Sequence, residues 1–491
     1  MKLITCLSRI LGSALFSLWI GLVFCPPPLS SQERFRKTPP SPEPLSELRL
    51  PSLEPARLSN GLTLAVAYRE NCPITSLQLI ILAGESDSPE KVPGVATLAA
   101  HLLPRGTQML SSSDIEEIIE SIGGNFSHST SLDYSFFTFN FLEEYLDQAL
   151  EILSKMILQP VFLETELENE KRNLFYDLLE KGRDADFVAR RLLLRILLGK
   201  HPYQKSIFNE DVIKNIKQKD ILDFFDKFYR PNNAILILTG NLNLTTATRK
   251  VSHYLNTWQK KDLDRPFLPA AEPNEKEKIC FVDIPQAKDS TIYLGNISLP
   301  ITSPDFFPFL VLNQVLGGTP ISRLFMNLRE SKGYAYYAFS EAEFYKSCGI
   351  FLVSAKVTPE ASYTSIQEIL KEISGVVQEK ISNFEIEQAK SSLIGNFPLS
   401  IEKYDHFSSQ ISKIIAFNLG EEHWGKYYEN IMLVDSEKVF EVAQLYHLTT
   451  PVVVIAGSKN NVIDFLRAFE KIEVYNSKGI FQYNITKGGG E

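Results

Sequence analysis

The stretch Gly94-Val95-Ala96-Thr97-Leu98-Ala99-Ala100-His101-Leu102-Leu103-Pro104-Arg105-Gly106-Thr107 decides the fold class of this chain. Its run of apolar and small residues predicts a helix, and Pro93 stands near the first turn, where a missing N–H is tolerated. Positions i, i+3 and i+4 of a helix share one face. Thr97, Ala100 and His101 therefore lie together, so that this face combines a hydroxyl, a methyl group and an imidazole.

The stretch resembles the zinc-binding helix of insulinase/pitrilysin-type peptidases, which are inverzincins with His-x-x-Glu-His on one helix. In these enzymes the two histidines bind Zn²⁺ and the glutamate activates the bound water. The family pattern is Gly-φ-Ala-His-φ-φ-Glu-His-φ-φ-φ-Lys-Gly-Thr, where φ is an apolar residue. Five of its residues are in register here: Gly94, Ala96, His101, Gly106 and Thr107. The resemblance implies a degenerate motif, because Thr97 and Ala100 replace the first histidine and the glutamate.

The third zinc ligand of the family is a glutamate from a later helix. The segment from Glu168 to Asp177 is similar to that helix, and Asp177 falls on the ligand place, 76 residues after His101 (177 − 101). Glu170 matches a supporting acid two turns earlier. A catalytic zinc site has three protein ligands and a water, whereas His101 and Asp177 supply two and the Thr97 hydroxyl is a poor third. We therefore expect no metal here, and we expect His101 to pack or hydrogen-bond.

Composition excludes some classes of function. The 491 residues are 44% hydrophobic and 22% charged, as in a globular protein of more than one domain. The net charge of −9 argues against a nucleic-acid partner, which needs a basic patch.

The first residues are typical of a secretory signal. Lys2 and Arg9 precede an apolar run of about 15 residues, which is shorter than the roughly 20 needed to span a bilayer. We expect cleavage after Ser31 and an exported protein, periplasmic or extracellular. The alternative is a lipoprotein anchored to the membrane through Cys25, although Phe24 is bulky for such a signal. The remaining cysteines are too few and too scattered for a disulfide framework and are expected to be buried free thiols: Cys72, Cys280 and Cys348.

The second half of the chain repeats the plan of the first. Tyr229 to Gly240 parallels Tyr446 to Gly457 at an offset of 217 residues (457 − 240), and Thr75 to Leu79 parallels Ser290 to Leu294 at 215 (290 − 75). Two matches at nearly one spacing indicate a duplicated domain.

The insulinase resemblance implies the same duplication. It predicts an α+β fold of two tandem homologous domains arranged as a clam-shell, each a mainly antiparallel sheet packed against helices. The expected divisions are a signal peptide (1–31), a flexible lead-in (32–52), an N-terminal domain with the degenerate metal motif (53–259), a linker (260–278), a C-terminal domain (279–476) and a tail (477–491).

The second half carries a further family signature. Gly317-Gly318-Thr319-Pro320-Ile321-Ser322-Arg323-Leu324-Phe325 and the residues up to Tyr336 are similar to the family's Gly-Gly-x-x-x-Ser-Arg-Leu segment. In active relatives an arginine and a tyrosine seven residues later hold the substrate backbone near the scissile bond. Arg329 and Tyr336 keep that spacing (336 − 329 = 7). A guanidinium and a phenol can both donate hydrogen bonds to carbonyls or an oxyanion. The alternative is a solvated helix face and a tyrosine that only packs.

The resemblance therefore predicts a non-catalytic subunit of a two-chain, processing-peptidase-like zinc peptidase. Its partner would carry the intact zinc site, zinc would be present in that partner only, and this chain would bind the peptide substrate through Arg329 and Tyr336. Two alternatives remain at this stage. One is a stand-alone peptide-binding or scaffold protein on a peptidase fold, and the other is an altered-site metallopeptidase that uses His101 and Asp177.

Overall fold

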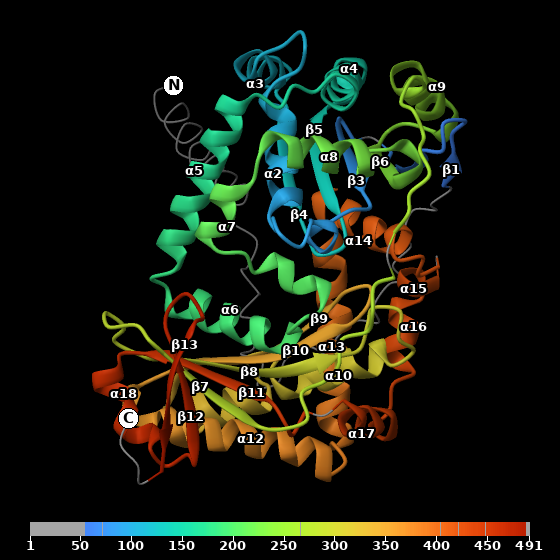
Figure 1. Ribbon diagram of the computed structural model, residues 1–491. Helices are drawn as coiled ribbons and strands as arrows, with labels where there is room; N and C mark the ends of the chain where they lie inside the picture. The colour runs from blue at the N-terminus through green and yellow to red at the C-terminus, as the bar shows by residue number, and fades with distance from the viewer. Residues whose placement is uncertain are drawn as a thin grey trace, which may run out of the picture. The chain divides into compact units, whose positions relative to one another are not determined.

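Two β-sheets, one in each half of the chain, organise the protein (Figure 1). The structure is a computed structural model that describes residues 55–70, 72–265, 267–402, 404–420, 422–446 and 448–487. The predicted signal peptide and lead-in lie outside these described residues, as do residues 488–491.

The first sheet has six strands in the order β1-β2-β6-β3-β5-β4. Only the pairing of β2 with β6 is parallel, and the other neighbours are antiparallel. A turn at Asn60-Gly61 joins β1 to β2, and Gly61 has a φ of +92°, which glycine adopts readily. The strands are β1 (Ala56–Arg57), β2 (Thr63–Tyr68), β3 (Ile74–Ile81), β4 (Asn125–Thr130), β5 (Ser135–Leu142) and β6 (Ala234–Gly240).

The second sheet has seven strands in the order β13-β12-β7-β11-β8-β10-β9. β7 runs parallel to both β11 and β12, and the remaining pairs are antiparallel. The strands are β7 (Lys278–Asp283), β8 (Ser290–Ser298), β9 (Ala335–Phe344), β10 (Gly349–Val357), β11 (Val452–Gly457), β12 (Lys471–Tyr475) and β13 (Phe481–Thr486). The segment predicted as a tail after residue 476 thus contains β13, which pairs antiparallel with β12 and places Ile485 opposite Ile472.

The strand order supports the duplication. The run β2-β6-β3-β5-β4 of the first sheet corresponds to β7-β11-β8-β10-β9 of the second, with the same parallel and antiparallel pairings. The two sequence matches fall on equivalent central strands, β6 with β11 and β3 with β8. The predicted fold class, two tandem α+β units with mainly antiparallel sheets, is confirmed.

Helices of both halves cover the sheets. Those of the first half are α2 (Val95–Leu102), α3 (Ser112–Ser121), α4 (Leu146–Leu158), α5 (Glu164–Lys181), α6 (Ala185–Leu198), α7 (Glu210–Asn215), α8 (Gln218–Phe228) and α9 (Leu244–Leu255). Those of the second half are α10 (Phe306–Leu316), α11 (Arg323–Phe325), a π-helical turn (Met326–Ser331), α12 (Ser362–Gln378), α13 (Asn383–Glu402), α14 (Tyr404–Ala416), α15 (Glu422–Gly425), α16 (Tyr427–Met432), α17 (Ser436–Leu445) and α18 (Lys459–Leu466).

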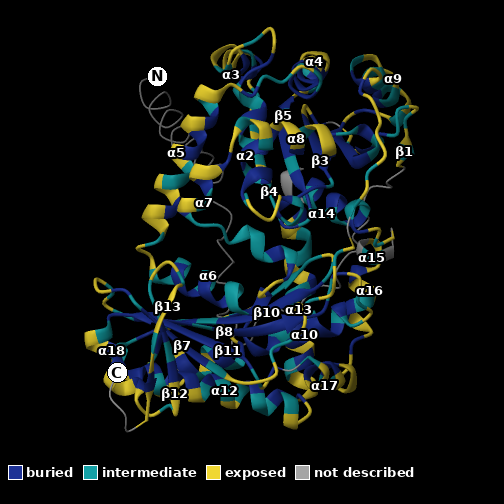
Figure 2. Cartoon of the chain, in the orientation of Figure 1, coloured by how far each residue is buried: buried dark blue, intermediate teal, exposed yellow. Residues whose placement is uncertain are grey.

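One helix from each half packs on the sheet of the other half. α6 lies against β8 and β11 of the second sheet, and α14 lies against β3 and β6 of the first (Figure 1). Leu192 of α6 is buried with Val454, and Ile411 of α14 is buried with Ile237. Burial of these apolar faces joins the two halves into one body of structure. Figure 2 shows the buried strands between helices whose outer faces are exposed.

The described residues also bear on membrane-spanning helices and on the state of the cysteines. Within them, no helix is both long and apolar enough to cross a membrane. The three cysteines are buried free thiols, as predicted: Cys72, Cys280 and Cys348.

Candidate functional site

Helix α2 is the predicted motif helix, and it is almost wholly packed. It begins after Gly94, whose φ of +96° is left-handed, and ends at Leu102. Its neighbours are α5, α8 and β4. Six of its eight residues are buried, which leaves Thr97 and His101 as the partly exposed positions of the predicted catalytic face.

Thr97 is held by a buried carboxylate. Its backbone N–H donates to Glu85 Oε1 at 2.7 Å, and its hydroxyl donates to the same oxygen. The other oxygen of Glu85 accepts from the Gly94 N–H at 3.1 Å and the Ser88 hydroxyl at 3.0 Å. Glu85 is only 3% exposed. Burial raises the pKa of Glu85, and the hydrogen bonds from Thr97, Ser88 and Gly94 oppose that rise. Glu85 thus caps the N-terminus of α2, and it also holds the hydroxyl of Thr97, the residue at the first ligand position of the motif.

His101 is held by a second acid. Its Nδ1 lies 3.2 Å from Glu170 Oε2, while Arg105 Nε donates to Glu170 Oε1 at 2.9 Å. The guanidinium of Arg105 also reaches Glu116, at 3.1 Å. Burial acts to raise the pKa of Glu170, but the hydrogen bond from His101 and the charge of Arg105 outweigh it, so the pKa is lowered. Glu170 is one of four buried residues on α5, a helix that is otherwise largely exposed (Figure 2).

Between these groups, Ala100 is fully buried in the core of the first half. Its methyl group packs where active relatives have a carboxylate, and it can neither bind nor deprotonate water. No side chain on α2 therefore replaces the missing general base.

Asp177 lies apart from this arrangement. It follows Glu170 by two turns of α5, so both project from roughly the same face. Its carboxylate accepts from Lys181 Nζ at 2.8 Å, and both side chains are about half exposed. The carboxylate at His101 is that of Glu170, and Asp177 forms an ordinary i,i+4 surface pair.

The residues present do not fit a zinc ion. A zinc site needs three ligands that converge on one point, but the hydroxyl of Thr97 faces Glu85 and the imidazole of His101 faces Glu170. Across the part of the chain that the structure describes, no group of three or more His, Cys, Asp or Glu side chains is arranged to hold a metal.

His128 on β4 completes the cluster. Its ring centre is 4.9 Å from that of His101, and its Nδ1 is buried without a hydrogen-bond partner among the described residues. Burial, then the charges of His101 and Arg105, lower the pKa of His128 to about 4, and the charge of Glu170 opposes them. His128 is thus expected to be neutral in the folded protein at neutral pH.

The stability of the fold should therefore depend on His128 in acid. Because its pKa falls from an ordinary 6.5 to about 4 on folding, the unfolded chain alone takes up this proton between those values. Stability from this group should be fully present above about pH 6.5 and fall by up to about 3 kcal/mol as the pH drops to 4. His128→Phe should flatten this part of the profile in urea unfolding at pH 4.5, 5.5 and 7.5.

The matched control for this measurement is His253→Phe, at an exposed histidine on α9. It should leave the slope between pH 4.5 and 7.5 as in the parent chain. An unaltered slope in His128→Phe would show that the buried ring does not carry the proton linkage.

The second-half signature divides into structural and exposed residues. Gly317 ends α10 against β9, where an added Cβ would lie 2.2 Å from the backbone nitrogen of Ser340. Arg323 forms a two-pronged pair with Glu385, at 2.6 and 3.0 Å. Ser322 donates to the carbonyl of Thr319. Because these residues contact other parts of the same chain, this part of the signature has a structural role.

Arg329 and Tyr336 differ from the rest of the signature because both are exposed. The side chain of Arg329 is 47% exposed and Tyr336 is 55% exposed. Arg329 lies in the π-helical turn Met326–Ser331, a geometry that is frequent at functional sites. Its guanidinium donates to the carbonyl of Tyr336 and lies over the ring of Phe325. The structure therefore brings these two predicted residues together.

The neighbouring tyrosines behave differently. The Tyr337 hydroxyl donates to Asp186 of α6 and ties the two halves together. Tyr334 is less exposed than Tyr336, and Lys332 Nζ lies 5.9 Å from its ring centre. Of the three, Tyr336 is the one whose side chain is exposed.

Three residues of the first-half site were not predicted from the sequence: Glu85, Arg105 and His128. Arg105 stands at the lysine position of the motif, and this match is a signal for a basic residue in the site. No local sequence pattern indicates a role for Glu85, which lies 12 residues before Thr97 in a short 3-10 turn (Glu85–Asp87). No pattern indicates a role for His128 either, since it is a single residue on an edge strand.

The sequence matches known families over more than half of its length. Residues 64–211 match the family described as Insulinase (Peptidase family M16), and residues 215–393 match the one described as Peptidase M16 inactive domain. The chain belongs to the insulinase family. With Thr97 and Ala100 at the catalytic positions, it is a degenerate, non-catalytic, peptidase-like member of that family.

Individual relatives of the insulinase family are distant but cover most of the chain. "Non-peptidase homolog YmxG" from Helicobacter pylori is 27% identical, over 70% of this chain and 80% of that protein. "Uncharacterized zinc protease YmxG" from Bacillus subtilis is 23% identical, over 72% of this chain and 86% of that protein. Among solved structures, a peptidase M16 inactive domain from Pseudomonas fluorescens has a TM-score of 0.78 at 20% identity, covering 83% of this chain and 98% of that one. The last comparison shows the shared fold.

Proposed function

We propose that this protein is the non-catalytic, peptide-binding subunit of a two-chain insulinase-type zinc peptidase. Its partner supplies the intact His-x-x-Glu-His site and the zinc. This chain supplies Arg329 and Tyr336, which bind the peptide backbone near the bond that the partner cleaves. The pair acts in the exported compartment, since residues 1–31 are typical of a secretory signal.

The observation that carries this proposal is the contrast between the two sites. In the first half, the former catalytic face is occupied by internal bonds: Thr97 to Glu85 and His101 to Glu170. In the second half, Arg329 and Tyr336 keep the family spacing and stay exposed. Arg329 stands in an unusual π-helical turn and Tyr336 on the strand β9 that follows, so both polar groups are accessible to a ligand.

The chemistry of the exposed pair suits a peptide ligand. A guanidinium presents forked N–H donors to backbone carbonyls, and a phenol adds one further O–H donor. Such donors stabilise the negative charge that develops on a carbonyl oxygen during cleavage. The Nη1 of Arg329 already donates to the carbonyl of Tyr336, and its Nε lies 3.7 Å from Glu330 Oε1. The other N–H groups of the guanidinium are therefore the donors for a peptide.

The names of two relatives support the two roles in this proposal, a non-catalytic subunit and a zinc peptidase. A protein named as a non-peptidase homologue from Helicobacter pylori and proteins named as zinc proteases, such as that from Bacillus subtilis, both align with this chain. The family therefore includes chains named in both ways, as a division of labour between subunits requires.

The proposal is tested by purification and reconstitution. The tagged chain, purified from its native extract, should bring down an equal amount of a chain with an intact His-x-x-Glu-His motif. That partner alone should cleave peptides slowly, and mixing the two chains should restore chelator-sensitive cleavage. A partner that is equally active without this chain would overturn the proposal.

The purified chain by itself should hold no stoichiometric zinc. The side chains at the motif face other groups, so the three converging ligands of a catalytic site are missing. Elemental analysis after dialysis should give well under one zinc per chain, and the isolated chain should leave peptides uncut. One retained zinc per chain, together with chelator-sensitive cleavage, would instead establish an altered-site metallopeptidase.

A further inference from the structure

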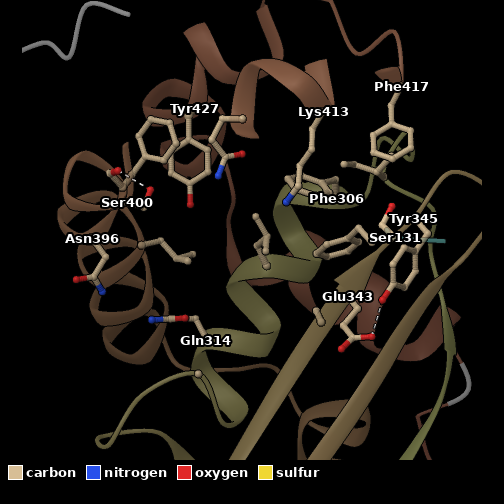
Figure 3. Close-up of a pocket in the computed structure, with 18 of the residues that line it drawn as sticks. Ser131, Phe306, Gln314, Glu343, Tyr345, Asn396, Ser400, Lys413, Phe417 and Tyr427 are labelled. Carbon is tan, nitrogen blue, oxygen red and sulfur yellow. Dashed lines mark hydrogen bonds between the residues drawn. The ribbon is translucent and has the colours of Figure 1, made fainter. Parts of the chain in front are cut away.

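A cavity of about 590 Å³ lies between elements of both halves, apart from the residues discussed above. The turn between β4 and β5 forms one side, and α10, α13, α14, α16 and the end of β9 form the others (Figure 3). Its size lies within the range of pockets that bind small ligands. Seven aromatic side chains line it: Tyr134, Phe306, Phe344, Tyr345, Phe397, Phe417 and Tyr427.

The acidic groups of the cavity wall are already paired. Glu343 accepts from Arg190 and from the hydroxyl of Tyr345. Asp133 accepts from the Tyr203 hydroxyl at 2.6 Å and from the Lys346 N–H at 3.1 Å. Both carboxylates therefore have partners, and among the described residues neither forms an ion pair with Lys413.

Lys413 is the exception among the charged residues that line the cavity. It extends from α14 into the cavity, with its ammonium near Phe306 (Figure 3). Among the described residues its Nζ has no hydrogen bond and no ion pair. Burial lowers the pKa of Lys413, and no nearby carboxylate opposes that effect. A partly buried ammonium without a counter-ion is costly, and an anion that entered the cavity would relieve that cost.

Gln410 offers a second polar group beside Lys413. The two are three residues apart on α14, so they project from neighbouring positions of one helix face. Gln410 Oε1 is buried and has no hydrogen-bond partner among the described residues. An amide oxygen accepts hydrogen bonds and would bind an N–H rather than an anion. The cavity thus presents an apolar wall, one cation and one unused acceptor.

We propose that this cavity binds the free C-terminal residue of a peptide whose last side chain is apolar. The terminal carboxylate pairs with the ammonium of Lys413, the N–H of the same residue donates to Gln410 Oε1, and the aromatic wall encloses the side chain. A fatty acid offers the same carboxylate and apolar body, but it has no N–H for Gln410. The unpaired acceptor therefore favours the peptide. The inference deepens the peptide-binding role proposed above and rests on it for the natural ligand.

The test is calorimetric titration of the isolated chain with three probes: N-acetylphenylalanine, its C-terminal amide, and octanoate. N-acetylphenylalanine should bind at least tenfold more tightly than the amide, because only the acid forms a charge-assisted bond with Lys413. Lys413→Met should remove this preference while the thermal midpoint stays equal or rises, since an unpaired buried charge is lost. Lys438→Met, at a lysine on α17 outside the cavity, should bind as the parent chain does.

Gln410→Leu separates the two sources of carboxylate. It should weaken N-acetylphenylalanine several-fold and leave 3-phenylpropionate, which lacks the N–H, within twofold. Equal binding of acid and amide, or full binding by Lys413→Met, would overturn the site. The peptide assignment would be overturned if octanoate bound more tightly than N-acetylphenylalanine and its affinity were the same in Gln410→Leu. These titrations need no partner and no cleavage, so their failure is distinct from failure of the reconstituted peptidase.

Discussion

Replacing Arg329 by alanine should lower kcat of the reconstituted two-chain peptidase by about 10²–10³, the usual cost of losing one donor to a developing oxyanion. Tyr336→Phe removes only a hydroxyl and should act in the same direction. Because both side chains are about half exposed, the free energy of unfolding should change by about 0.5 kcal/mol or less. Single-turnover kinetics of the reconstituted pair, with thermal melts of the isolated variants, measure both quantities.

The control for this experiment is Arg467→Ala, at an exposed arginine that pairs with Asp464 three residues earlier. It removes the same charge from this chain and should leave kcat unchanged. Turnover within twofold of the parent in both Arg329→Ala and Tyr336→Phe would show that the pair is structural. A large fall in the melting temperature of Arg329→Ala would lead to the same conclusion.

The sequence predicted the elements of the first-half site better than their contacts. The motif around His101 identified α2, and its altered letters at Thr97 and Ala100 predicted that zinc chemistry would be absent. Helix period and residue type are properties of neighbouring positions, so they predicted the helix, while the family resemblance implied the degenerate zinc motif. The partner of Thr97 is a carboxylate from a preceding turn, and the partner of His101 is Glu170 from α5. Such pairings depend on tertiary packing, which periodicity does not encode.

The exchange of helices between the halves shows the same limit at the level of the fold. Apolar periodicity indicates that a helix has a buried face, but it does not show that α6 covers the second sheet while α14 covers the first. An amphipathic helix specifies that one face is buried, and any apolar sheet face satisfies that requirement. The domain duplication could be predicted because the segments that form β6 and β11 share a sequence pattern. The cavity around Lys413 could not be predicted from the sequence, because elements that are far apart along the chain build it.

Glu85→Ala should destabilise the fold more than any other single change at the former catalytic face. The Glu85 carboxylate accepts hydrogen bonds from the N–H groups of Gly94 and Thr97 and from the hydroxyls of Thr97 and Ser88. Alanine leaves these donors in a buried pocket without an acceptor, and each unpaired buried donor costs about 1–3 kcal/mol. Partial entry of water would offset some of this loss. We expect a decrease of roughly 3 kcal/mol in the free energy of unfolding, measured by urea denaturation at pH 7.5.

Two further variants serve as controls for Glu85→Ala. Glu85→Gln keeps the shape and one carbonyl acceptor for Thr97, so its loss should be less than half that of alanine. Glu117→Ala removes an exposed carboxylate on α3 and should stay within about 0.5 kcal/mol of the parent. If Glu85→Ala were as stable as Glu117→Ala, the carboxylate would not be the cap that fixes Thr97. The Thr97 hydroxyl would then be free to turn toward His101, and its bond to Glu85 would no longer exclude a metal ion at this face.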